Sequence, residues 1–118
     1  MEDSRLRQSM LLDFYGELLT PRQRECYDLH CNEDLSLAEI AEQCGISRQG
    51  VWDNIRRAEA VLADIEEKTG LIRRFSDTES ALTLLGEKLK TLAALSQGEA
   101  RGLAEEILQE LQELQTRG

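Results

Sequence analysis

The stretch from Ser36 to Leu62 places the strongest constraint on how this chain folds, because it predicts two helices joined by a tight turn. Gly45 stands where the turn must open with a positive φ, a conformation that costs glycine little. Ala41 stands where the two helices cross closely, and Val51 points from the second helix back at the first. The stretch therefore predicts a helix-turn-helix, the unit that places its second helix in the major groove of DNA.

Length and composition limit what surrounds this unit. The chain has 118 residues, 41% of them hydrophobic, which is enough for one small domain with or without an appendage. One proline and long stretches rich in Leu, Glu, Ala and Gln predict an all-α protein. No run approaches the roughly 20 apolar residues that span a bilayer, and the charged residues after Met1 do not resemble a signal peptide. We therefore expect no membrane insertion and a cytoplasmic location.

The sequence contains no recognisable catalytic constellation and no familiar metal-binding spacing. There is one histidine, His30, and neither a glycine-rich phosphate loop nor a nucleophile–base pattern. Cys26, Cys31 and Cys44 fit no known zinc unit, and an odd number of cysteines argues against a disulfide framework. We expect them to serve as small core residues. The chain is therefore predicted not to be an enzyme and to need no cofactor or metal ion, so its function must come from a surface.

Helix-capping residues and apolar spacing divide the chain into helices. The expected helices span residues 4–18, 21–31, 37–44, 48–68, 77–95 and 99–115, with a linker at 71–77. Thr20 followed by Pro21 is typical of a helix start. Ser36 with Glu39 three residues later forms a capping box. Gly70 predicts the end of the long fourth helix.

Apolar residues at helical spacing predict which faces of these helices are buried. The first helix carries Leu6, Met10, Leu11, Phe14 and Leu18. The short third helix carries Leu37, Ile40, Ala41 and Cys44, and the fourth carries Val51, Ile55, Ala58, Leu62 and Ile65. The last two carry Leu82, Leu85, Leu89 and Leu92, then Ala104, Ile107, Leu111 and Leu114. The stripes of these last two helices step by three and four residues, as in a coiled coil.

The chain is therefore expected to contain a helix-turn-helix domain over residues 1–70 and a C-terminal helical extension over residues 71–118. Each of the last two helices covers only about two to three heptads, too few for an independent coiled coil. We expect them to form a helical hairpin. Two alternatives stay open at this point: the stripes complete an intramolecular core, or they build a homodimer.

Charge complicates the prediction of a nucleic-acid-binding protein. The net charge is −9, although neutralisation of phosphates usually drives the affinity of such proteins for nucleic acids. Residues 20–60 carry eight acidic and five basic side chains, which gives −3. Only residues 47–58, the presumed second helix of the motif, are positive, at +2. One copy is therefore expected to bind DNA weakly and in a salt-sensitive manner.

Two sets of segments carry a family resemblance. The letters LTPRQRE followed by SLAEIAEQCGISRQGVWDNIRRAEAVL resemble region 4 of bacterial sigma factors, a four-helix unit that reads promoter DNA. More closely, LLDFYGELLTPRQR, ISRQGVWDNIRRAE and LADIEEKTGLI resemble the YlxM family (UPF0122), small bacterial helix-turn-helix proteins, over residues 11–75. The resemblance implies a sigma-region-4-like fold and no enzymatic activity. Genes of this family typically sit beside that of the signal recognition particle GTPase, which implies a regulatory role in that pathway.

The resemblance also implies which residues contact DNA. On or beside the exposed side of the second motif helix it places Arg48, Gln49, Trp52, Asp53, Arg56 and Arg57. Arginine can contact a guanine edge or a phosphate, and glutamine an adenine edge. Trp52 can stack on an unpaired base or insert into a groove of a protein. Asp53 is unusual for a helix that reads DNA. Its carboxylate can accept a hydrogen bond from cytosine, but it repels phosphate groups.

Arg22 and Arg24 are two further candidates, at the start of the preceding helix. They can hold a phosphate at that helix N-terminus, or they are ordinary solvated surface residues.

Two functions follow as hypotheses. The first is a DNA-binding regulatory protein with a contiguous positive face. The alternative is a protein-interaction module that binds the signal recognition particle GTPase or its RNA, because acidic surfaces complement basic ones.

Overall fold

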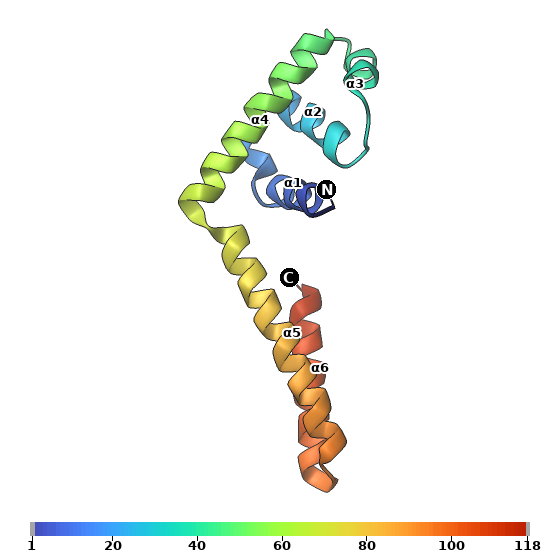
Figure 1. Ribbon diagram of the computed structural model, residues 1–118, viewed down its shortest axis with the longest axis vertical. Coiled ribbons are helices and arrows are strands. Elements are labelled where there is room, and N and C mark those ends of the chain that lie inside the picture. Colours follow the sequence, from blue (N-terminus) through green and yellow to red (C-terminus); the bar gives the residue numbers. More distant parts are fainter. Residues whose placement is uncertain (1, 118) are drawn as a thin grey trace. The chain divides into compact units, whose positions relative to one another are not determined.

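The computed structural model describes residues 2–117, and these form six α-helices, one short 3₁₀ helix and no strand (Figure 1). The elements are α1 (Glu2–Tyr15), η1 (Gly16–Leu18), α2 (Pro21–Cys31), α3 (Leu37–Cys44), α4 (Arg48–Thr69), α5 (Leu71–Leu95) and α6 (Gly98–Arg117). The predicted all-α fold class is confirmed. The helices form two compact units, Met1–Ile72 and Arg73–Gly118, called here the helix-turn-helix unit and the hairpin unit.

Helix ends in the helix-turn-helix unit follow the capping chemistry that the sequence indicates. The hydroxyl of Thr20 accepts from the backbone N–H of Gln23, and the Gln23 side chain accepts from the Thr20 N–H. Ser36 and Glu39 form the same reciprocal pair at the start of α3. Gly45 ends α3 with a φ of 69°. Local chemistry therefore fixes the bounds of α2 and α3 before tertiary packing is considered.

Two apolar clusters hold the helix-turn-helix unit together, and α4 contributes to both. The first comprises Leu11, Leu12, Tyr15, Leu19, Tyr27, Cys31, Ala58, Leu62 and Ile72. The second comprises Cys26, Ile40, Ala41, Val51 and Ile55. The expected stripe of α4 is confirmed from Val51 to Leu62, with Ile65 partly buried. Since α4 runs through both clusters, it fixes the position of α3 and of the turn between them.

The predicted stripe of the first helix is only partly right. Leu11 is buried and Met10 packs against the core, as predicted, but Leu6, Phe14 and Leu18 are exposed, and Leu12 and Tyr15 are buried instead. The hydroxyl of Tyr15 explains the difference, because it is buried against α4 and donates to the Glu66 carboxylate at 2.6 Å. The helix also ends earlier than predicted, and residues 16–18 continue as the 3₁₀ turn η1. A tyrosine with a buried partner therefore determines which face of α1 turns inward.

The predicted linker at 71–77 is also wrong, because α5 begins at Leu71 directly after Gly70. Gly70 ends α4 with a φ of 62°, as expected. The carboxylate of Glu66 then accepts the backbone N–H of Ile72 at 3.0 Å. An α-helix leaves its first N–H groups without partners inside the helix, and this carboxylate satisfies one of them. Buried Glu66 thus allows a new helix to start where the sequence alone suggests a loop.

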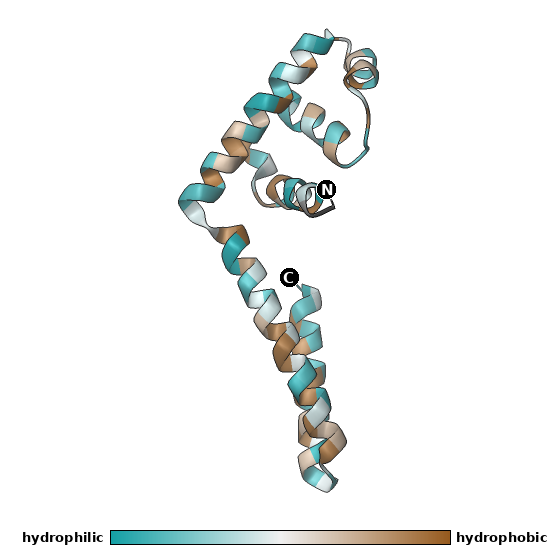
Figure 2. Ribbon diagram, in the orientation of Figure 1, coloured by the Kyte–Doolittle hydropathy of each residue, from teal (hydrophilic) through white to brown (hydrophobic). Residues whose placement is uncertain are grey.

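The hairpin unit consists of the antiparallel helices α5 and α6. Gln115 donates to the hydroxyl of Thr83 at 3.2 Å, and a Cβ added at Gly86 would lie 3.5 Å from Leu111. The buried positions of this unit hold small residues, namely Gly86, Ala93 and Ala104. Figure 2 shows hydrophobic residues along much of both helices. The two predicted stripes are therefore only half buried, since Leu85, Leu92, Ile107 and Leu114 are exposed.

Candidate nucleic-acid interface

The turn between α3 and α4 is fixed by backbone and side-chain hydrogen bonds. The backbone N–H groups of Gly45 and Ile46 both donate to the carbonyl of Ala41, at 2.9 and 3.2 Å. The hydroxyl of Ser47 accepts the N–H of Gly50 at 3.0 Å and caps α4. Such a turn has little freedom, so the N-terminal half of α4 is presented as a rigid rod.

The two sides of this half of α4 differ sharply. Val51, Ile55 and Ala58 are buried against the neighbouring helices. The opposite side, called here the α4 surface, is exposed and comprises Arg48, Gln49, Trp52, Asp53, Arg56 and Arg57. All six candidate residues of the motif helix therefore lie on the exposed side, where the sequence places them.

Trp52 and Arg56 form a pair on the α4 surface. The guanidinium carbon of Arg56 lies 5.3 Å from the centre of the Trp52 ring. This distance is within the range of a cation–π interaction, which restrains both side chains. Even so, 43% of Trp52 remains exposed. A large aromatic side chain with a cation beside it is therefore available to an incoming partner.

The charged groups of the α4 surface are not neutralised by one another. The Gln49 side-chain amide donates to the Asp53 carboxylate at 3.1 Å, so the two residues suspected of reading bases hold each other. Within residues 2–117, no ion pair joins Arg48, Arg56 or Arg57 to a carboxylate. Three guanidinium groups therefore face solvent without an acidic partner.

Arg22 and Arg24 have different surroundings. Arg22 donates to the carboxylate of Glu25 at 3.1 Å and to the backbone carbonyl of Cys44 at 3.2 Å. The second bond satisfies a carbonyl at the end of α3, a common use of a basic side chain. Arg24 is exposed, with its Nε close to Gly16. Arg22 therefore lies at the helix-turn-helix turn, engaged in holding it, while Arg24 lies near η1.

Glu25 shapes the electrostatics of the turn, although the sequence alone does not single out this residue. Its carboxylate accepts from Arg22 and also from the Cys44 thiol, with Sγ 3.0 Å from Oε1. Burial raises the pKa of Cys44 to about 11, and the hydrogen bond to the Glu25 carboxylate adds to the shift. The spacing of Arg22 and Glu25, three residues apart on a helix, is the signal that predicts their pairing.

The remaining cysteines and the histidine do not form a site. Cys26 and Cys31 are buried core residues, as expected, and burial raises the pKa of both thiols. His30 is exposed, with Nδ1 3.4 Å from the carbonyl of Leu35. In the part of the chain that the structure describes, no three His, Cys, Asp or Glu side chains gather as metal ligands would. That same part has no helix with the length and apolar character to span a bilayer.

Comparison with known proteins places the chain in a family. Residues 2–101 match the model of the UPF0122 family, described as "Putative helix-turn-helix protein, YlxM / p13 like". A UPF0122 protein of Acetivibrio thermocellus is 47% identical over 109 residues, covering 89% of this chain and 93% of the relative. A relative from Geobacillus kaustophilus is 43% identical over 114 residues, covering 97% and 99% of the two chains. The chain therefore belongs to the UPF0122 family of helix-turn-helix proteins.

Proposed function

We propose that the α4 surface binds duplex DNA and that the protein acts as a DNA-binding regulator. Membership of a helix-turn-helix family supports the proposal, since such motifs insert their second helix into the major groove. The observation that carries it is the set of three exposed guanidinium groups, of Arg48, Arg56 and Arg57, that lack carboxylate partners within the described residues. Unpaired cations on a protein with a net charge of −9 are a local exception that favours an anionic ligand.

The side chains divide between positioning and reading. Arg48 lies in the first turn of α4, where backbone N–H groups also favour a phosphate. Arg56 lies two turns further along and is steadied by the Trp52 ring, which preorganises it for a guanine edge or a phosphate. Gln49 reads a base only after it exchanges its bond to Asp53 for one to adenine. The arginines therefore supply most of the affinity, and the Gln49–Asp53 pair modulates specificity.

The affinity of one copy is expected to be modest. Three arginines neutralise at most about three phosphates, which predicts that log K falls with log [salt] with a slope of roughly −2.7. The acidic residues elsewhere in the chain oppose binding at long range, and salt screens that repulsion as well. A shallow slope and a weak affinity are therefore part of the proposal.

A gel-shift titration of the full chain against a pool of random-sequence duplexes tests this function. Arg56→Ala and Arg57→Ala should each weaken binding by about 1–3 kcal/mol where the side chain meets a guanine, or reduce the salt slope by about one where it meets a phosphate. Arg101→Ala is the matched control, because Arg101 is an exposed arginine of α6 already paired with Glu105. No retardation by the wild type at low salt, or equal loss in the control, would contradict the proposal.

A second candidate function uses the same surface to bind a protein. We propose as this alternative that the chain docks on the signal recognition particle GTPase or on its RNA, as the resemblance to the YlxM family suggests. Trp52 favours it, because a tryptophan that is 43% exposed and flanked by an arginine has the composition of an interface anchor. The acidic remainder of the chain suits a basic partner.

Capture of the purified GTPase, with and without its RNA, tests the alternative. Trp52→Ala should weaken capture by at least tenfold, the usual effect of removing an aromatic anchor. Leu6→Ala is the control, since it removes another exposed apolar side chain from the same unit. Equal capture by wild type, Trp52→Ala and Leu6→Ala would remove Trp52 from this function.

A further inference from the structure

The hairpin unit carries more apolar surface than its own two helices use. On each helix we define an inner stripe of less exposed residues and an outer stripe of exposed residues beside it. The inner stripes are Leu82, Gly86, Leu89 and Ala93 on α5, and Ala104, Leu108, Leu111 and Gln115 on α6. The outer stripes are Leu85, Lys88, Leu92 and Leu95 on α5, and Leu103, Ile107, Glu110 and Leu114 on α6.

Both outer stripes keep the three-and-four spacing of a coiled-coil seam. Every inner-stripe residue is buried or partly buried, and every outer-stripe residue is exposed. One helix needs only one such stripe to pack against one neighbour, so a second stripe indicates a second neighbour. Leu95, at 80% exposed, is the extreme case. The spacing is therefore that of helices in a larger bundle than the hairpin.

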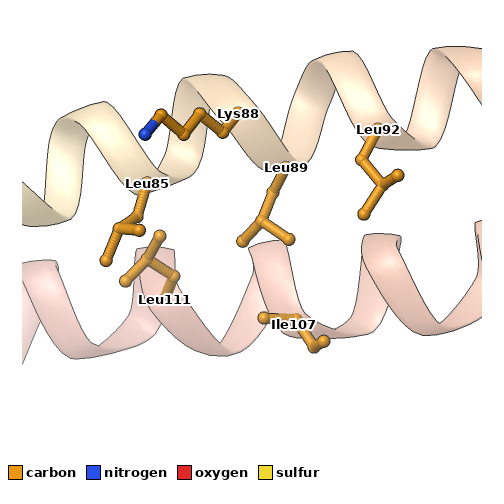
Figure 3. Close-up of a pocket in the computed structure, with 6 residues that line it drawn as sticks. All are labelled: Leu85, Lys88, Leu89, Leu92, Ile107 and Leu111. Carbon is orange, nitrogen blue, oxygen red and sulfur yellow. The ribbon is translucent and has the colours of Figure 1, made fainter.

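The two outer stripes border the same groove. A cavity of about 330 Å³ lies between the helices, and its lining mixes the two kinds of stripe (Figure 3). Leu89 and Leu111 of the inner stripes both line it, and Leu111 lies beside Leu85 of the outer stripe. Leu85, Lys88 and Leu92 line it from α5, and Ile107 lines it from α6. At this groove, residues of the two outer stripes therefore lie on the same side of the hairpin, which we call its apolar face.

Each outer stripe contains one charged residue, and the two charges are opposite. Lys88 interrupts the stripe of α5, and Glu110 interrupts that of α6. Gly86 of α5 lies against Leu111 of α6. Because the two helices are antiparallel, moving two residues forward along α5 means moving two residues back along α6. Lys88 therefore lies at the level of residue 109, next to Glu110. No ion pair joins Lys88 or Glu110 to another residue in the described range 2–117. A positive and a negative group therefore stand at one level of the same apolar face, both unpaired.

We propose that this face binds the same face of a second copy of the chain, forming a four-helix bundle with a two-fold axis parallel to the helices. Such an axis preserves levels and places α5 against α6 of the other copy. Lys88 then faces Glu110 of the partner subunit, and the symmetry forms this pair twice. The leucines of the outer stripes become the core of the bundle, as in the a and d layers of four-helix proteins.

Charge selects a second copy over an unrelated apolar partner. The α5 helix carries four basic and three acidic residues, or +1, whereas α6 carries two basic and five acidic, or −3. The proposed arrangement pairs these helices between copies, and it separates the two copies of α6 diagonally. A two-fold interface must be complementary to itself, and this face satisfies the condition with a single pair of opposite charges.

The dimer stands independently of the proposed DNA binding, although it affects how DNA would be engaged. A dimer carries two copies of the helix-turn-helix motif, which is the number that a palindromic site requires. A monomeric chain that still retards DNA would contradict the dimer alone.

Sedimentation analysis of full-length variants tests the proposal. Wild type should be a dimer, and Lys88→Glu or Glu110→Lys should each weaken dimerisation by roughly tenfold or more, because each brings two like-charged pairs together. The equimolar mixture of these two variants should recover dimers, since Lys and Glu again face each other at both positions. Affinity-tagged Lys88→Glu should capture untagged Glu110→Lys and not untagged Lys88→Glu.

Two control variants carry the same charge reversals elsewhere. Lys90→Glu and Glu105→Lys change exposed residues of α5 and α6 that lie outside both stripes, and each loses only a surface pair. They should dimerise like wild type, and far-UV circular dichroism should show unchanged helix content in all variants. A monomeric wild type overturns the proposal, as does a dimer that Lys88→Glu does not weaken or a mixture that recovers nothing.

Discussion

The two units of this protein carry similar apolar spacing and use it in different ways. The helix-turn-helix unit encloses large side chains such as Tyr27, Ile40 and Leu62. Among the described residues of the hairpin unit, the buried ones are glycine and alanine, and most of the leucines are exposed. Three or more helices can surround a side chain, whereas two helices meet along one line. The comparison shows that an apolar stripe predicts a helix, whereas the number of neighbouring helices determines how much of that stripe is buried.

Buried polar contacts show the same contrast. In the helix-turn-helix unit, buried Glu66 accepts from the Tyr15 hydroxyl at 2.6 Å and from the Ile72 N–H, so it ties α1 and α4 to the start of α5. In the hairpin unit, the hydrogen bond between the Gln115 and Thr83 side chains is exposed. Buried polar contacts fix one arrangement of a core, because breaking them leaves an unsatisfied group. Buried polar contacts therefore fix the arrangement of the first unit, whereas the side-chain contact between α5 and α6 is exposed to solvent.

The largest expected effect comes from truncating one leucine in each unit. Leu62 is fully buried at 0% exposed, whereas Leu92 is 51% exposed. Leu62→Ala should lower the free energy of unfolding by about 2–5 kcal/mol, whatever the protein concentration. Leu92→Ala should cost less, and its cost should grow with protein concentration because the proposed dimer would bury this side chain. Urea denaturation at two protein concentrations, followed by circular dichroism, measures both.

Leu84→Ala is the control for the second effect, since Leu84 is an exposed leucine of α5 outside both stripes. Its cost should be small and independent of concentration. Equal losses for Leu62→Ala and Leu92→Ala, or a concentration dependence in Leu84→Ala, would break the contrast between the two units.

Local chemistry made most of the fold predictable. Capping by Thr20, Ser36 and Ser47, and left-handed glycines at 45 and 70, fix five helix ends without reference to tertiary structure. The buried face of α1 and the absence of a linker before α5 could not be predicted from the sequence, and both for one reason. Both depend on Glu66, whose partners Tyr15 and Ile72 lie 51 positions before it and six after it. Spacing rules treat a glutamate as solvated and have no means of placing it in a core.

The candidate interface divides in the same way. Helical periodicity suffices to place Arg48, Trp52 and Arg56 on one exposed side, because their four-residue spacing is a property of the helix. Periodicity does not reveal that Arg22 donates to the Cys44 carbonyl, since that contact joins two different helices and two residues 22 positions apart in the sequence. The outer stripes of the hairpin were hidden for a related reason. Each predicted stripe of α5 and α6 combined inner and outer residues, and only the second helix shows which are which.

Two glycines sharpen the comparison at the level of about 1 kcal/mol. Gly45 has a φ of 69°, so Gly45→Ala should destabilise the helix-turn-helix unit by about 1–2 kcal/mol through backbone strain alone. Gly86 is helical, and its added Cβ would meet Leu111 at 3.5 Å, an ordinary contact. Gly86→Ala should therefore stabilise the hairpin by about 0.5–1 kcal/mol. Thermal unfolding of both variants measures the opposite signs.

Gly45→Asn provides the matched control, because asparagine tolerates the left-handed region better than alanine. It should lose less stability than Gly45→Ala. Destabilisation by Gly86→Ala would mean that α5 and α6 pack more tightly than the inner stripes indicate.

A last contrast between the units is a difference in thiol reactivity. Burial of the Cys44 thiol raises its pKa from 9.0 to about 11, and the hydrogen bond to Glu25 adds to the shift. At pH 8 its thiolate fraction, and with it the alkylation rate, should be about 100-fold lower than that of an ordinary thiol. The substitution Leu84→Cys places a thiol on the exposed surface of the hairpin, where alkylation should be fast. Mass spectrometry after a timed reaction with iodoacetamide compares the two sites.

The pH dependence of Cys44 alkylation shows whether a raised pKa or restricted access makes the reaction slow. A raised folded-state pKa means that the neutral thiol stabilises the folded state, fully below pH 9 and progressively less as the pH rises toward 11. Alkylation of Cys44 should therefore accelerate steeply over that interval, and Glu25→Gln should shift the acceleration to lower pH by removing the negative charge. Slow alkylation that ignores both pH and Glu25→Gln would show that access alone protects the thiol. The core of the helix-turn-helix unit would then act at Cys44 as a steric barrier, without the electrostatic contribution that the Glu25 contact implies.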